Sequence, residues 1–161
     1  MVMLIILGPQ QNVQQRFKLL HKVAAGGRVA VAKMLLKLVP KAVAIQDENG
    51  DLPLHVVLRE RPCKANRDML KILLNYSVKE QVGGAEGHYG LMVMNNNSKA
   101  PIDHVMLKCY HSDYGFGDHK RSIYLNILLS QAPDTPVLHR ALHVLVNGCP
   151  LVRTIVERYP K

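Results

Sequence analysis

Apolar residues recur along much of this chain at the three- and four-residue spacing of one helix face. No segment sustains the strict alternation of apolar and polar residues that is typical of a strand. Glycines and prolines fall between the apolar stretches and interrupt them. The pattern predicts an all-α chain of roughly eight helices, paired two by two. Outside the motif described next, the apolar stretches are 13–24, 31–38, 69–73, 105–109, 123–129, 137–146 and 151–156.

A polar turn that leads directly into a helix start occupies residues 47–55. Its sequence is Asp-Glu-Asn-Gly-Asp-Leu-Pro-Leu-His. Asn49-Gly50 is a strong turn dipeptide, because glycine adopts a positive φ without steric cost. Pro53 suits the first turn of a helix, where the N–H that proline lacks would have no partner within the helix. We therefore expect a turn over 47–51 and a helix from about residue 53.

Parts of this pattern return elsewhere, which predicts a repeat array. His21 lies 34 residues before His55. Residues 21–26 and 143–148 both run from a histidine to a glycine, and the helical stretch after each closes on Pro-Lys. Residues 100–107 parallel 52–58, with Asp103 in the histidine position, and a long polar insertion at 109–120 then interrupts that unit. We expect a single domain, 1–161, with units at about 13–46, 47–88, 89–134 and 135–161 and a cap or frayed segment at 1–12.

The stretch from Asp47 to Leu58 resembles the start of an ankyrin repeat, in which Thr-Pro-Leu-His opens the first of two helices. Leu52 replaces the threonine, whose hydroxyl would cap the helix, so we expect a start weaker by about 1 kcal/mol, with Asp51 supplying part of the cap. The resemblance implies an ankyrin-like solenoid of paired antiparallel helices with an irregular third unit. It also implies that His21, His55 and His143 bond backbone in an adjacent turn.

The same resemblance implies a function: a non-catalytic adaptor or scaffold that binds a partner protein through the concave surface of the array. No nucleophile, phosphate-loop or metalloprotease motif is present in the sequence, so neither an enzyme, a cofactor nor a small-molecule substrate is expected. The residues expected to contact the partner lie at the turn and around the end of the following helix: Asp47, Glu48, Asn49, Asp51, Val57, Arg59 and Glu60.

The positive charge of the chain adds an alternative. The formal net charge is +9, and residues 1–80 hold 13 Lys and Arg against 6 Asp and Glu. Some of these basic residues are four apart and would share a helix face: Lys33, Lys37 and Lys41 in one set, Arg67 and Lys71 in another. The ordinary interpretation is a solvated outer face. The functional interpretations are a surface for an acidic partner protein, or electrostatic binding of nucleic acid by the N-terminal half.

The cysteines and the two ends of the chain bear on compartment. Three cysteines without a close pair predict reduced thiols and an intracellular protein, in the cytoplasm or, as the alternative, in the nucleus. The apolar start 1–7 is too short to span a membrane, which takes about 20 residues, and it lacks the features of a secretory signal. The sequence ends without a polar capping repeat, which is consistent with a fragment of a longer array.

The insertion holds the densest group of metal-ligand residue types, which includes Cys109, His111 and His119. Zinc sites usually carry pairs of ligands at regular short spacings, and no pair in the insertion has such a spacing. We expect a solvated loop there and no metal site.

Overall fold

The computed structural model describes residues 12–84, 89–110, 123–128 and 130. This part of the chain is helical and contains no strand, which confirms the all-α prediction for it. The helices predicted at 137–146 and 151–156, the fourth unit and His143 lie outside the described residues. The elements are α1 (Asn12–Ala25), α2 (Val29–Leu38), the 3-10 helix η1 (Pro40–Ala44), α3 (Pro53–Arg59), α4 (Lys64–Lys79) and α6 (Pro101–Tyr110), and residues 123–128 are also helical.

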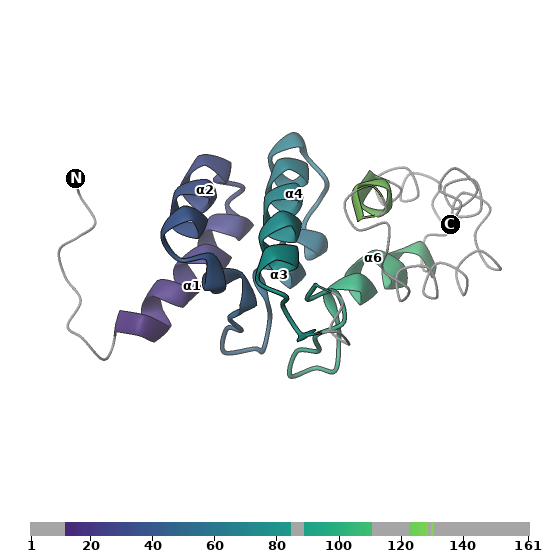
Figure 1. Ribbon diagram of the computed structural model, residues 1–161. Coiled ribbons are helices and arrows are strands. Elements are labelled where there is room, and N and C mark those ends of the chain that lie inside the picture. Colours follow the sequence, from purple (N-terminus) through teal and green to yellow (C-terminus); the bar gives the residue numbers. More distant parts are fainter. Residues whose placement is uncertain (1–11, 85–88, 111–122, 129, 131–161) are drawn as a thin grey trace.

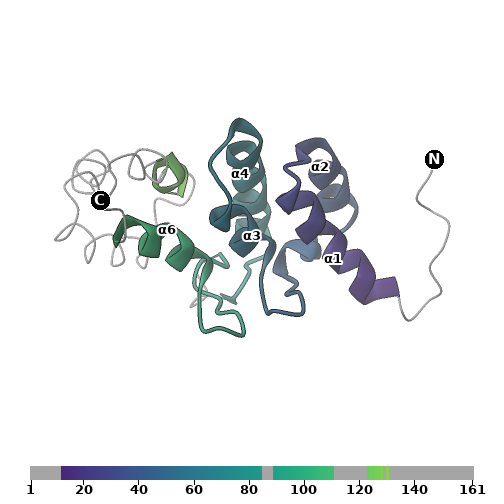
Figure 2. The same cartoon turned by 180° about the vertical axis from the view of Figure 1, so that it is seen from behind.

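These helices pack as pairs that follow one another in a row. α1 packs against α2, and α3 packs against α4. Contacts between the pairs join α1 to α3 and α3 to α6 in one layer, and α2 to α4 in the other. Figure 1 shows the pairs side by side, and Figure 2 shows the same order from behind. Each pair therefore buries its apolar face against the next one.

Proline and cysteine set the ends of two helices in ways that the apolar pattern does not reveal. Pro40 is not simply a terminator: it is the first residue of η1, because its fixed φ suits the first turn of a helix. The N-cap of α4 is Cys63, whose Sγ accepts the N–H of Asn66 at 3.5 Å. An exposed cysteine thus occupies a position where serine or threonine is more usual.

Leucine dominates the interior, as expected for closely packed helices without tryptophan. The largest fully buried side chains are all leucines except for Met69. Tyr124 adds an aromatic anchor, because its hydroxyl lies 3.1 Å from the carbonyl oxygen of Val57 and 3.2 Å from that of Glu60. Burial raises the pKa of the Tyr124 phenol, so it stays protonated and able to donate. This contact ties residues 123–128 to the C-terminal end of α3.

Candidate functional site

The turn before α3, residues 47–51, is closed by its own hydrogen bonds, and we call it the first loop. The Asp47 N–H donates to the Asp51 carbonyl at 2.9 Å, and the Gly50 N–H donates to the Asp47 carbonyl at 3.0 Å. The Asp47 carboxylate accepts the N–H groups of Asn49 at 2.8 Å and Asp51 at 2.9 Å. The side chain of Asp47 therefore serves to hold the turn.

Residues 95–99 form a second loop with the same hydrogen bonds. The Asn95 N–H donates to the Lys99 carbonyl at 2.9 Å, and the Ser98 N–H donates to the Asn95 carbonyl at 3.0 Å. The Asn95 side-chain oxygen accepts the N–H groups of Asn97 at 2.9 Å and Lys99 at 3.0 Å. Each of these four bonds of the first loop has its counterpart 48 residues later.

The two loops lie against each other. The Asn96 N–H donates to the Asn49 carbonyl at 2.9 Å, and the Asn96 side-chain amide donates to the Glu48 carbonyl at 3.0 Å. Gly50 has a φ of +74°, and a Cβ there would lie 2.6 Å from the Asn96 side-chain oxygen and 2.8 Å from the Asn96 nitrogen. Glycine is thus needed at this position both for the turn and for the approach of the second loop.

Two histidines connect a helix to the loop that follows it in the chain. Nδ1 of His55 accepts the N–H of Leu52 at 2.8 Å, and Nε2 donates to the Lys99 carbonyl at 3.0 Å. Nε2 of His21 donates to the Asp51 carbonyl at 2.7 Å. Both acceptors are the last residue of a loop. The expectation that these two histidines bond backbone in a neighbouring turn is confirmed.

Asp103 takes in α6 the position that His55 has in α3, and it keeps one of the two bonds of His55. Its carboxylate accepts the N–H of Ala100 at 2.8 Å, as Nδ1 of His55 does for the N–H of Leu52. A carboxylate has no N–H to extend to a further loop, whereas the imidazole of His55 has one. In α3 and α6, the N–H of the residue before the helix is therefore accepted by a side chain of the first helical turn. The expectation that Asp51 supplies part of the cap of α3 is wrong, because the acceptor is Nδ1 of His55.

The protonation state of His55 follows from its surroundings. Burial lowers the pKa of the imidazole, and the Lys99 carbonyl and the Asp51 carboxylate offset this only in part. A neutral ring is required by the geometry, because Nδ1 can accept the Leu52 N–H only when it carries no proton. The ring also lies edge to face with His104, with centroids 5.9 Å apart.

Asp51 lies inside a polar network and not at the surface. Its carboxylate accepts the side-chain amide of Asn95 at 2.6 Å and the guanidinium of Arg59 at 3.1 Å. Burial alone would raise the pKa of this carboxyl, but the Asn95 hydrogen bond and the guanidinium of Arg59 hold it below its usual range. The network joins the two loops and the end of α3.

The structure separates the seven predicted contact residues into two groups. Asp51 and Val57 are buried and cannot contact a partner, which corrects the prediction for both. Asp51 is enclosed by the second loop, and Val57 is enclosed because α3 packs against α1, α4 and α6. The other residues reach the surface: Asp47 is partly exposed, and Glu48, Asn49, Arg59 and Glu60 are exposed. The Lys18 ammonium pairs with Glu48 and holds the pKa of that carboxyl below its usual range.

The basic residues singled out from the sequence lie in the other layer. Lys33 and Lys37 are exposed on α2, Lys41 is exposed on η1, and Lys71 is exposed on α4, where Arg67 is half-buried. α2 and α4 pack against each other, so these side chains belong to neighbouring helices. They do not belong to the stacked loops.

Sequence reasoning missed the second loop as a surface feature. Asn96, Asn97 and Ser98 are exposed at its tip, beside the tip of the first loop. The signal was present, because Asn95 to Pro101 aligns with Asp47 to Pro53 once the parallel between 100–107 and 52–58 is extended backwards. Asparagine and serine stand there in place of aspartate and glycine, and this substitution hid the match.

Other site types find no support in the described residues. No group of three or more histidine, cysteine, aspartate or glutamate side chains could hold a metal ion among them. Cys109 lies in α6, whereas His111 and His119 lie outside the described residues. None of the described helices is both long enough and apolar enough to cross a membrane.

Comparison of the chain with protein-family models, with curated proteins and with solved structures found no match. The class that the fold itself defines is an all-α protein of paired helices, within the part of the chain described.

Proposed function

We propose that this chain is an ankyrin-like repeat module whose stacked loops bind a partner protein. The observation that carries the proposal is the recurrence of one loop, bond for bond, at residues 47–51 and 95–99. In a repeat array, each unit contributes the same loop to one edge of the array. The recurring loop, bonded to the helices by His21 and His55, is consistent with such an arrangement.

The chemistry of the loop tips suits recognition of a protein. The backbone of each loop is occupied by internal hydrogen bonds, so the tip keeps its shape when it meets a partner. Exposed Glu48, Asn49, Asn97 and Ser98 offer donors and acceptors, and Arg59 adds a positive charge near the loops. Rigid loops with varied polar tips favour binding by shape and hydrogen bonding and need no catalytic group.

Capture of partners on the full-length tagged chain, with and without nuclease, tests this function. Partners are identified by mass spectrometry. We expect a protein that is retained after nuclease and is lost by about tenfold or more when both tips are changed by Asn49→Lys and Asn97→Lys. Asn75→Lys is the matched control, because Asn75 is an exposed asparagine on α4, away from the loops. Equal retention by the double variant and the control would refute a role for the loops.

Electrostatic binding of nucleic acid is the second candidate, and the exposure of Lys33, Lys37, Lys41 and Lys71 favours it. Phosphate contacts release counterions, so affinity for a nucleic acid would fall steeply as salt rises. Partners that disappear after nuclease treatment, with binding weakened by glutamine at these lysines, would favour this candidate over the first.

A further inference from the structure

Exposed apolar side chains gather on α2. The described part of the chain exposes six large apolar side chains, and four of them belong to α2 and its C-cap residue. Of the other two, Val78 lies on α4 and Met94 lies directly before the second loop. The exposed fractions of the four are 41% for Val31, 66% for Met34, 78% for Leu38 and 43% for Val39.

α2 is apolar on two opposite sides. Ala32 and Leu36 are fully buried against the rest of the molecule. Val31, Met34 and Leu38 follow one another at the three- and four-residue spacing that forms a stripe along a helix, on the side away from the buried pair. A helix with apolar residues on both sides is typical of one that is covered on both sides.

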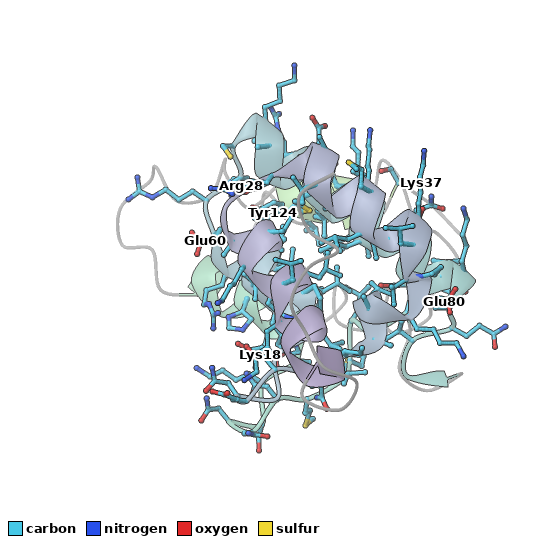
Figure 3. All side chains as sticks on the ribbon, turned by 90° about the vertical axis from the view of Figure 1, so that its left-hand side faces the viewer. Lys18, Arg28, Lys37, Glu60, Glu80 and Tyr124 are labelled. Carbon is cyan, nitrogen blue, oxygen red and sulfur yellow. The ribbon has the colours of Figure 1, made fainter. Side chains whose placement is uncertain are left out.

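Lysines border this stripe, and no acidic residue accompanies them. Lys33 and Lys37 lie on α2 and Lys41 lies on η1, all three exposed, and residues 29–44 contain no aspartate or glutamate. Within the described residues, no carboxylate lies at ion-pair distance from any of the three. Figure 3 shows the Lys37 side chain projecting away from the ribbon. The α2 face, defined as Val31, Met34, Leu38 and Val39 with Lys33, Lys37 and Lys41, is therefore both apolar and positive.

We propose that the α2 face is a docking surface for an acidic amphipathic helix of a partner protein. This is a second surface, separate from the stacked loops, and it does not depend on their function. A ligand helix can lay apolar residues at the same spacing against the stripe while its carboxylates meet the lysines. The stripe from Val31 to Leu38 covers about 10 Å along the helix axis, which matches about two turns of a ligand helix.

Charge and composition favour this occupant over others. A second copy of the chain carries the same net charge of +9, so self-association through a positive face is disfavoured. Nucleic acid would satisfy the lysines but would leave the stripe in water, and residues 29–44 contain no aromatic side chain on which a base could stack. Only a ligand that is both apolar and acidic complements the whole face.

The test uses the full chain and a fluorescein-labelled synthetic peptide of about 16 residues, long enough to populate a helix. The peptide carries leucines at the spacing of the stripe and flanking glutamates. A scrambled peptide of the same composition and a peptide with lysines in place of the glutamates serve as ligand controls. The protein variants are Met34→Gln with Leu38→Gln, and Lys33→Gln with Lys37→Gln. Their matched controls change exposed residues of the same kind elsewhere: Val78→Gln with Met94→Gln, and Lys22→Gln with Lys64→Gln.

We expect fluorescence anisotropy to show binding of the acidic amphipathic peptide alone. The Kd should rise about tenfold or more with Met34→Gln and Leu38→Gln, because the apolar contact area is lost. It should rise several-fold with the lysine pair, and the control variants should stay within about twofold of the parent chain. Circular dichroism verifies that each variant folds, as expected for substitutions of exposed side chains.

Four results would overturn the proposal. The first is that the acidic peptide does not bind, and the second is that the scrambled peptide binds equally well. The third is that the matched control variants lose as much affinity as the α2 variants, and the fourth is that another probe gives a stronger response. The other probes are a single-stranded oligonucleotide, vesicles that contain phosphatidylserine, and the chain itself followed by sedimentation.

Discussion

Replacing His55 is the sharpest test of how α3 is joined to the second loop. His55 is fully buried, caps α3 through Nδ1 and reaches the second loop through Nε2. His55→Ala removes both bonds. His55→Asn keeps an acceptor close enough to the Leu52 N–H but is too short to reach the Lys99 carbonyl. The two variants therefore separate the effect of the cap at the start of α3 from the effect of the bond to the second loop.

The magnitudes follow from the two bonds and the burial. Loss of the cap leaves the buried Leu52 N–H without an acceptor, which costs about 1 to 2 kcal/mol. Loss of the bond to Lys99 costs about 1 kcal/mol, because that carbonyl keeps the N–H of Asn95. Removing the ring from a fully buried site adds about 1 to 2 kcal/mol. We expect a loss of about 3 to 5 kcal/mol for His55→Ala and about 2 kcal/mol for His55→Asn.

Urea unfolding followed by circular dichroism measures both values. With an m-value of about 2 kcal/mol per molar, His55→Ala should lower the midpoint by about 1.5 M or more. His55→Asn should lower it by about 1 M. A change below about 0.5 M for His55→Ala, or equal changes for the two variants, would refute the assigned bonds.

The pH dependence of stability gives an independent check on His55. Burial lowers the pKa of His55 in the folded state, whereas in the unfolded chain the pKa of histidine is about 6.5. Between these two values the unfolded state binds more protons, so stability rises with pH there. The contribution of His55 to the free energy of unfolding is complete above a pH of about 6.5, and it is lost as the pH falls through the pKa of His55 in the folded state. Between neutral and mildly acidic pH, the midpoint should therefore fall more for the parent chain than for His55→Asn.

Three further substitutions test the loops and the anchor of α3, each by urea unfolding. Gly50→Ala should cost about 2 to 4 kcal/mol, because the new Cβ clashes with the second loop and a positive φ is strained for alanine. The control Gly84→Ala has a positive φ but open space around it, and it should cost about 1 kcal/mol. Equal costs for the two variants would refute the close approach of the second loop to Gly50. Asn95→Asp should lower the free energy of unfolding by about 2 to 3 kcal/mol at neutral pH, because the new carboxylate faces that of Asp51. The stability of this variant should recover as the pH falls. An unchanged urea midpoint would exclude the contact between residues 95 and 51. Tyr124→Phe should cost about 1 kcal/mol through loss of its hydroxyl bonds, and no loss would show that the hydroxyl is not needed.

Much of the local structure was accessible from the sequence. The apolar periodicity predicted α1, α2, α4 and α6, and the Asp-Glu-Asn-Gly turn predicted the first loop with a helix start at Pro53. The resemblance to an ankyrin repeat implied that His21 and His55 bond backbone in an adjacent turn, and both do bond the backbone of the loop that follows their helix. The sequence was a poorer guide to the candidate site, because two of the seven predicted contact residues are buried and the second loop was missed.

There is a physical reason why the sequence predicted the local structure better than the candidate site. Helix periodicity, turn formation and capping act between residues a few positions apart, so the chain specifies them wherever it lies. Burial depends on what stacks against a residue, and the partners of the first loop are 44 to 48 residues away in the second. Only the tertiary structure could therefore show that Asp51 faces Asn95 and not a partner. Only the tertiary structure could show that the apolar stretch predicted over 31–38 leaves Val31, Met34 and Leu38 exposed.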